Sequence, residues 1–194
     1  MLLNDRQISI LAENDIFMPF VGEKMRTVGD GIKAISYGLS QAGYDIRLSD
    51  KQFLIFDGST RGQRPTLDPK AGSGEGAYDS TLIHGENGSY FVLPPHSFGL
   101  GVSHELISMP PDVMGLCDGK STYARCGVII NVTPIEPGWS GYLTMHIANP
   151  TAFPVKIYAN EGIVQVMLVG IEEVEFAYSG KYQNQGAQVT LATV

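Results

Sequence analysis

The spacing of glycine and proline is the feature that most restricts the fold of this chain. The sequence holds 23 glycines and 11 prolines in 194 residues, so turn-forming residues interrupt it at short intervals. Between them lie short runs rich in β-branched and aromatic residues: Gln52–Phe56, Tyr90–Leu93, Phe98–Ser103, Val113–Leu116, Gly127–Val132, Tyr142–Ala148, Val155–Tyr158, Gly162–Val169 and Val174–Tyr178. Many short strands at this spacing predict an all-β sandwich or barrel.

Only two short helical segments are predicted. Asn4 or Asp5 is a suitable N-cap for a helix over Arg6–Ala12. Ser121 is a suitable N-cap for a helical turn over Ser121–Cys126. Because longer helical periods are scarce, the alternation of strands and helices that is typical of parallel α/β folds is not expected.

Length and charge limit the number of domains that the chain can form and the classes of partner that it can bind. A chain of 194 residues suits one domain, and no repeat or linker divides it, so we expect a single domain over residues 1–194. The Gly- and Ser-rich stretch Gly58–Gly88 predicts long loops or an insertion. The net charge of −7 argues against a nucleic-acid polymer as partner, but it leaves room for a small anionic ligand.

Neither a membrane span nor an export signal is predicted. No run approaches about 18 consecutive apolar residues. The apolar N-terminal stretch is interrupted by Asp5 and Glu13 and lacks the basic start of a signal peptide. Cys117 and Cys126 form no CxxC pair, which favours a reducing, cytoplasmic setting.

Several catalytic motifs are missing from the sequence. It has no GxxxxGK[ST] phosphate loop and no GxSxG serine elbow. The histidines His84, His96, His104 and His146 have no zinc-ligand spacing, and His104-Glu105 is not followed by the PCxxC of zinc-dependent nucleobase deaminases. We therefore expect no zinc site.

The densest cluster of chemically useful residues begins at Lys120. Ser121 and Thr122 add two hydroxyl groups at a predicted helix start, and Arg125 follows Ser121 by about one helical turn. Backbone N–H groups, hydroxyls and cations together suit a phosphate group. A solvated turn with a capping serine is the simpler alternative.

The segment that contains this cluster, GKSTYARCGVIINVTPIEPGW, resembles the signature of the dCTP deaminases. Four further segments are similar to other blocks of that family, in order: SYGLSQAGYDIRLSD, LPPHSFGLGVSHELISMPPDVMG, KIYANEGIVQVMLV and GKYQNQGAQVTL. The chain is thus identified as a member of the dCTP deaminase family, in the dCTP deaminase/dUTPase superfamily. The resemblance implies a distorted, jelly-roll-like, dUTPase-like β fold with a few short helices. It also implies a homotrimer with active sites at subunit interfaces, and zinc-free hydrolytic deamination of dCTP to dUTP with Mg²⁺ on the triphosphate.

The resemblance also assigns roles to single positions. Lys120, Ser121, Thr122 and Arg125 match the triphosphate contacts and the active-site serine and arginine; Glu136 matches a deoxyribose contact; Lys181, Tyr182 and Gln185 match a tail that closes over the phosphates; and Tyr178 matches a further phosphate contact.

His146 departs from the family pattern, because it stands where the family carries a catalytic glutamate. In a strand, Leu143, Met145 and Ile147 would share one face, which leaves His146 on the other face with Thr144. His146 is therefore predicted to line the base pocket with Thr144, near Ser121 or Arg125. A neutral imidazole can take a proton from water, but an imidazolium near an arginine is disfavoured.

Three interpretations follow. The chain is a deaminase with weakened or altered chemistry, for example on a modified cytosine nucleotide; or it binds a nucleotide, to sequester or sense it, without turnover; or His146 is only a packed strand residue. A bifunctional deaminase and dUTP diphosphatase is a further alternative. The GVIDxxYRG-like block of dUTPases is missing, however, since residues 133–139 read TPIEPGW.

Overall fold

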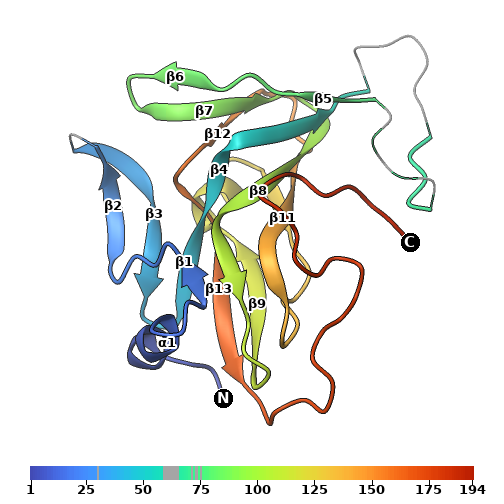
Figure 1. The fold of residues 1–194 in the computed structure, drawn as a ribbon. Helices are drawn as coiled ribbons and strands as arrows, with labels where there is room; N and C mark the ends of the chain where they lie inside the picture. Colours follow the sequence, from blue (N-terminus) through green and yellow to red (C-terminus); the bar gives the residue numbers. More distant parts are fainter. Residues whose placement is uncertain (30, 59–65, 71, 73, 75) are drawn as a thin grey trace.

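The computed structural model describes residues 1–194 except 30, 59–65, 71, 73 and 75, and the described part is mostly β-sheet (Figure 1). Its helices are α1 (Asp5–Ala12) and α2 (Ser121–Ala124). Its strands are β1 (Phe17–Met18), β2 (Lys24–Val28), β3 (Ile32–Ser40), β4 (Gly43–Phe56), β5 (Ala77–Asp79), β6 (Ile83–Gly85), β7 (Gly88–Leu93), β8 (Ser97–Ser108), β9 (Val113–Gly119), β10 (Ile129–Asn131), β11 (Ser140–Asn149), β12 (Val155–Tyr158) and β13 (Gly162–Gly170).

The long strand β4 joins the two halves of the main sheet. Its first half pairs with β3 and β13, and its second half pairs with β8 and β5. The register against β8 shifts between Leu48 and Phe53, where the strand changes partners and the sheet curls. Among the described residues, the main sheet runs in the order β10-β11-β8-β4-β13-β9, and a second sheet runs β12-β7-β6. The predicted all-β, jelly-roll-like class is confirmed.

The core fills the inside of this curled sheet. Alternate residues of β4 and β11 point inward, and Tyr44, Phe53 and Met145 have no exposed surface. The ring of Phe17 stacks on that of Tyr44, with ring centroids 4.3 Å apart. Because one face of β11 packs into this core, its other face, which carries Thr144 and His146, is left outside the core.

The helices agree with the sequence except at one cap. Asn4 caps α1 in a capping box with Gln7, and Ile8 is buried, as the pattern predicts. The predicted cap of α2 is wrong, because the N-cap residue is Lys120 and Ser121 is already the first helical residue. α2 also ends at Ala124, short of the predicted Cys126. No helix in the described part of the chain is long and apolar enough to cross a membrane.

The first eight predicted strand runs fall on strands, but Val174–Tyr178 does not. In this segment, the N–H of Val174 donates to Pro111 O, and the N–H of Tyr178 donates to Pro137 O. The segment therefore pairs with two loops rather than with a strand edge. Within the predicted loop Gly58–Gly88, residues 59–65, 71, 73 and 75 lie outside the described residues, and the remainder includes β5 and β6.

Candidate functional site

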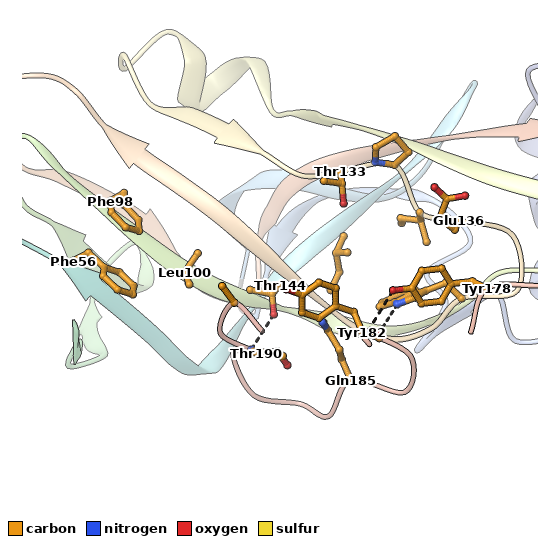
Figure 2. A pocket seen from close by; sticks show the side chains of 15 residues that line it. Phe56, Phe98, Leu100, Thr133, Glu136, Thr144, Tyr178, Tyr182, Gln185 and Thr190 are labelled. Atoms are coloured by element: carbon orange, nitrogen blue, oxygen red, sulfur yellow. Dashed lines mark hydrogen bonds between the residues drawn. The ribbon is translucent and has the colours of Figure 1, made fainter. Parts of the chain in front are cut away.

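A cavity of about 530 Å³ opens between the β10–β11 connection and the C-terminal segment (Figure 2). β4, β8 and β11 form its floor, the connection forms one wall, and the C-terminal segment forms the other. Its lining residues are Phe56, Phe98, Leu100, Thr133, Pro134, Ile135, Glu136, Trp139, Leu143, Thr144, Tyr178, Tyr182, Gln185, Thr190 and Ala192.

The connection and the C-terminal segment are bonded to each other at the cavity. The buried indole of Trp139 donates from Nε1 to the carbonyl of Tyr182 over 2.7 Å. Gly138 has φ of +78°, and a Cβ there would lie 2.6 Å from the Cβ of Ala177, so glycine permits this close approach. The wall around the cavity mouth is thus held by specific contacts.

Beyond Tyr182 the C-terminal segment runs beside β11 (Figure 1). The N–H of Tyr142 donates to Gln185 O over 3.0 Å. The N–H of Thr190 donates to Thr144 Oγ1 over 3.1 Å, which is a dashed line in Figure 2. These bonds place Gln185 and Thr190 over the strand and close one side of the cavity with the chain's own tail.

The two ends of the cavity differ in chemistry (Figure 2). Phe56, Phe98 and Leu100 form an apolar end, where the two phenylalanine rings stack with centroids 4.5 Å apart. Glu136 and Tyr178 lie at the other end, with Thr144 between the two ends. A ligand with a planar ring and a polar, hydroxyl-bearing part matches this arrangement.

His146 lies on the outward face of β11, as the strand alternation predicts. Met145 and Ile147 are fully buried on the opposite face. The His146 ring is 5.2 Å from the Phe98 ring, and His146 pairs across the sheet with Leu100. His146 therefore stands beside the apolar end, although it is not among the residues that line the cavity.

The imidazole of His146 is poised in its neutral form. Burial lowers the pKa of His146 below the ordinary histidine value. Its Nδ1 is buried and has no hydrogen-bond partner among the described residues. The predicted neighbours Ser121 and Arg125 are thus not bonded to Nδ1 within one chain.

Lys120 is held inside the protein by an ion pair. Its Nζ lies 2.6 Å from Asp45 Oδ2 and 3.1 Å from Ser36 Oγ. The side chain of Lys120 is only 11% exposed, and that of Asp45 is fully buried. The ion pair largely neutralises the charge of Lys120 and links the start of α2 to β4.

The other α2 residues face solvent. Ser121, Thr122 and Arg125 are exposed, and Arg125 Nη1 donates to the Ser121 carbonyl over 2.9 Å. This bond turns the guanidinium back toward the first residue of the helix. The cluster keeps the donors that suit a phosphate group. None of its residues lines the cavity.

The sequence matches the family model described as dCTP deaminase-like over residues 24–171. The chain belongs to the dCTP deaminase-like family. A protein from Alcanivorax borkumensis named dCTP deaminase is 42% identical over 187 residues, covering 94% of each chain. Another of the same name from Campylobacter hominis is 46% identical over 177 residues, covering 89% of this chain and 85% of its own.

A solved structure shares the fold of this family member. The crystal structure of 2′-deoxycytidine 5′-triphosphate deaminase from Agrobacterium tumefaciens aligns with a TM-score of 0.55 and 17% sequence identity. The alignment covers 86% of this chain but 47% of the solved chain, so this chain spans about half the length of that protein. At this identity the likeness supports the fold alone.

Within this dCTP deaminase-like fold, the candidate residues fall into two groups. The first group lines the cavity and consists of Glu136, Thr144, Tyr178, Tyr182 and Gln185. The second group, at α2, consists of Lys120, Ser121, Thr122 and Arg125. Lys181 belongs to neither group in this structure, because its Nζ donates to the carbonyl of Thr193.

Sequence reasoning missed the apolar end of the cavity and the tail contact at Thr190. Phe98 and Leu100 sit in a predicted strand, but only the register with β11 puts them beside His146. The ion pair between Asp45 and Lys120 was also not predicted from the sequence.

Proposed function

We propose that the single domain of residues 1–194 binds a pyrimidine deoxynucleoside triphosphate and hydrolyses dCTP to dUTP and ammonia without zinc. The observation that carries this proposal is the cavity, which is lined by four residues that match the family's nucleotide contacts, Glu136, Tyr178, Tyr182 and Gln185. Family membership supports the reaction class. The base would occupy the apolar end, and the deoxyribose would lie near Glu136.

The phosphate group requires a second copy of the chain in this proposal. The α2 cluster is exposed and does not line the cavity of its own chain. The chain is proposed to form a homotrimer, in which Ser121, Thr122 and Arg125 of one copy face the cavity of its neighbour. The end strand β10 supports such a contact, since Ile129 on it is 57% exposed.

A Mg²⁺ ion would arrive on the triphosphate. Among the described residues, no group of three or more His, Cys, Asp or Glu side chains is placed to hold a metal ion. Mg²⁺ commonly keeps several waters and binds through substrate phosphates, so it needs no dedicated set of protein ligands. The unpaired cysteines Cys117 and Cys126 suit the reducing cytoplasm that we propose as its setting.

His146 is the proposed proton-transfer group. Deamination adds water to C4 of cytosine, moves a proton to the ring, and expels ammonia. A neutral imidazole can accept the proton of that water, and the lowered pKa of His146 keeps it neutral at pH 7. Its conjugate acid forms reluctantly for the same reason, so proton delivery to the amine is slow.

The second candidate function is nucleotide binding without turnover. The unpartnered Nδ1 of His146 favours it, because no second group orients the imidazole for proton transfer. Such a protein would sequester or sense the nucleotide.

One experiment separates the two main candidates. The protein is incubated with each deoxynucleoside triphosphate and Mg²⁺, binding is measured by calorimetry, and products are separated by chromatography. Binding of dCTP with release of ammonia and dUTP supports the deaminase. Binding without product supports the sequestering protein. A chain that binds no pyrimidine nucleotide contradicts both.

A further inference from the structure

A second hollow of about 880 Å³ lies on another part of the molecule, between the β2–β3 hairpin and the sheet of β6, β7 and β12. These two parts stand side by side in Figure 1. The groove shares no lining residue with the cavity described above. It is a separate site in the chain.

Three cations of the hairpin line this groove: Lys24, Arg26 and Lys33. Arg26 and Lys33 have no carboxylate within 4.0 Å among the described residues. Lys24 Nζ lies 3.8 Å from Asp45 Oδ2, but that oxygen already bonds Lys120 Nζ at 2.6 Å. The positive charge of the groove is therefore largely uncompensated, in a chain whose net charge is −7.

Hydroxyl groups accompany the cations. Thr27 adds one from the hairpin, and Thr122 adds one from α2. Thr122 is adjacent to Ser121, whose carbonyl holds the guanidinium of Arg125. The groove and the α2 cluster therefore share Thr122. Together, the groove and the α2 cluster would offer a continuous row of hydrogen-bond donors that is longer than a single phosphate group.

Glu161 is the one carboxylate among the described residues that line the groove. It is 2% exposed, and its Oε2 accepts a hydrogen bond from the N–H of Ile35 over 2.6 Å. It therefore fixes β3, which carries Lys33, against the groove. Burial raises the pKa of the Glu161 carboxyl, which weakens its repulsion of an anion.

We propose that this groove is an oligophosphate-binding site, in which Lys24, Arg26 and Lys33 contact the anion and Thr122 marks its α2 end. The ligand is a diphosphate or triphosphate group, because three cations together with the hydroxyls of Thr27 and Thr122 exceed what a single phosphate needs. The group comes either from the distal phosphates of a nucleotide that also contacts α2, or from a separate oligophosphate. The inference goes beyond the proposed function, since it requires neither the cavity nor turnover.

Inorganic tripolyphosphate is the probe. Its binding is measured by calorimetry at low salt for the parent, for the double variant Arg26→Gln/Lys33→Gln, and for the control Arg6→Gln/Lys51→Gln. All four side chains are exposed, and both variants remove two positive charges. The groove variant is expected to bind about tenfold more weakly or worse, as the loss of two charge-assisted bonds predicts, and the control within about twofold. Equal unfolding temperatures verify that both variants fold.

An equal effect in both variants, or no effect in the groove variant, overturns the site. So does a loss of binding that appears in Arg125→Ala but not in the groove variant.

Saturation with dCTP then identifies the source of the phosphates. Tripolyphosphate that is displaced by dCTP, but not by dCMP, assigns the groove to the nucleotide's own phosphates; tripolyphosphate that still binds assigns it to a separate ligand. If no nucleotide binds but the groove variant still loses tripolyphosphate, the proposed function fails and this site stands.

Discussion

Lys120 Nζ lies 2.6 Å from Asp45 Oδ2, so the basic residue at the start of α2 is paired with a fully buried carboxylate on β4. The pair connects two parts of the sequence that are 75 positions apart. It fixes α2, and therefore the exposed Ser121 and Arg125, on the rim of the main sheet. Lys120 therefore positions the α2 cluster and contributes little free positive charge to it.

Asp45→Asn is expected to destabilise the fold strongly. Loss of one partner leaves Lys120 charged and enclosed, which typically costs about 3–5 kcal/mol for a buried pair. Urea unfolding followed by circular dichroism measures the free energy of unfolding. The double variant Asp45→Leu/Lys120→Met is the control, because it removes both charges and should regain most of the loss. A single variant as stable as the parent would show that the pair contributes nothing.

Trp139→Phe is expected to loosen the C-terminal segment. The change removes the hydrogen bond from Nε1 to the Tyr182 carbonyl while keeping an aromatic ring. One such bond contributes a net value of about 1 kcal/mol, so its loss makes local opening of the segment easier. Trypsin is therefore expected to cleave after Lys181 about two- to tenfold faster. Tyr90→Phe, on β7, is the matched control. Unchanged cleavage would mean that other contacts alone hold the tail.

The sequence predicted most of the fold because its strands are short, alternating and separated by glycine and proline. Val155–Tyr158 matches β12 residue for residue. The sequence missed β2, whose residues are mostly exposed and of mixed polarity, and β3, whose residues lack clear alternation. It also assigned Val174–Tyr178 to a strand, because local β propensity cannot reveal that this segment bonds to two loops instead of to a sheet.

Several of the residues predicted from the sequence line the cavity, but their arrangement in space could not be predicted. The strand alternation correctly put His146 on the face of Thr144. Its contact with Phe98 depends on the register between β8 and β11, which one strand's sequence does not encode. The separation of the α2 cluster from the cavity is likewise a tertiary property.

His146 is expected to make stability depend on pH. Its folded pKa lies below the ordinary value of 6.5, so between the two values the unfolded chain binds more protons. The free energy of unfolding should therefore fall as pH drops below about 6.5, by at most about 1.4 kcal/mol per pH unit. His146→Gln should lack this component, which chemical unfolding from pH 5 to 8 measures. Parallel pH profiles for parent and variant would contradict the burial of the imidazole.

Arg125→Ala is expected to weaken triphosphate binding by about 1.5–3 kcal/mol, the range for hydrogen bonds to a charged group. Calorimetry with dCTP and Mg²⁺ measures it, and Arg6→Ala on α1 is the control. If the site is shared between copies, mixing Arg125→Ala chains with Thr144→Trp chains, whose cavity is blocked, should restore part of the binding. A stable monomer in light scattering, or no restoration on mixing, would contradict the shared site.

The role of His146 is tested most directly by comparing dCTP turnover by the parent, His146→Glu and His146→Ala. Release of ammonia and dUTP is measured on preparations whose dCTP binding has been determined. The parent is expected to bind dCTP but to deaminate it slowly or undetectably. His146→Glu should be faster by at least about tenfold, given the usual size of general acid–base effects. Rapid turnover by the parent that is unchanged in His146→Ala would contradict the role assigned to this residue.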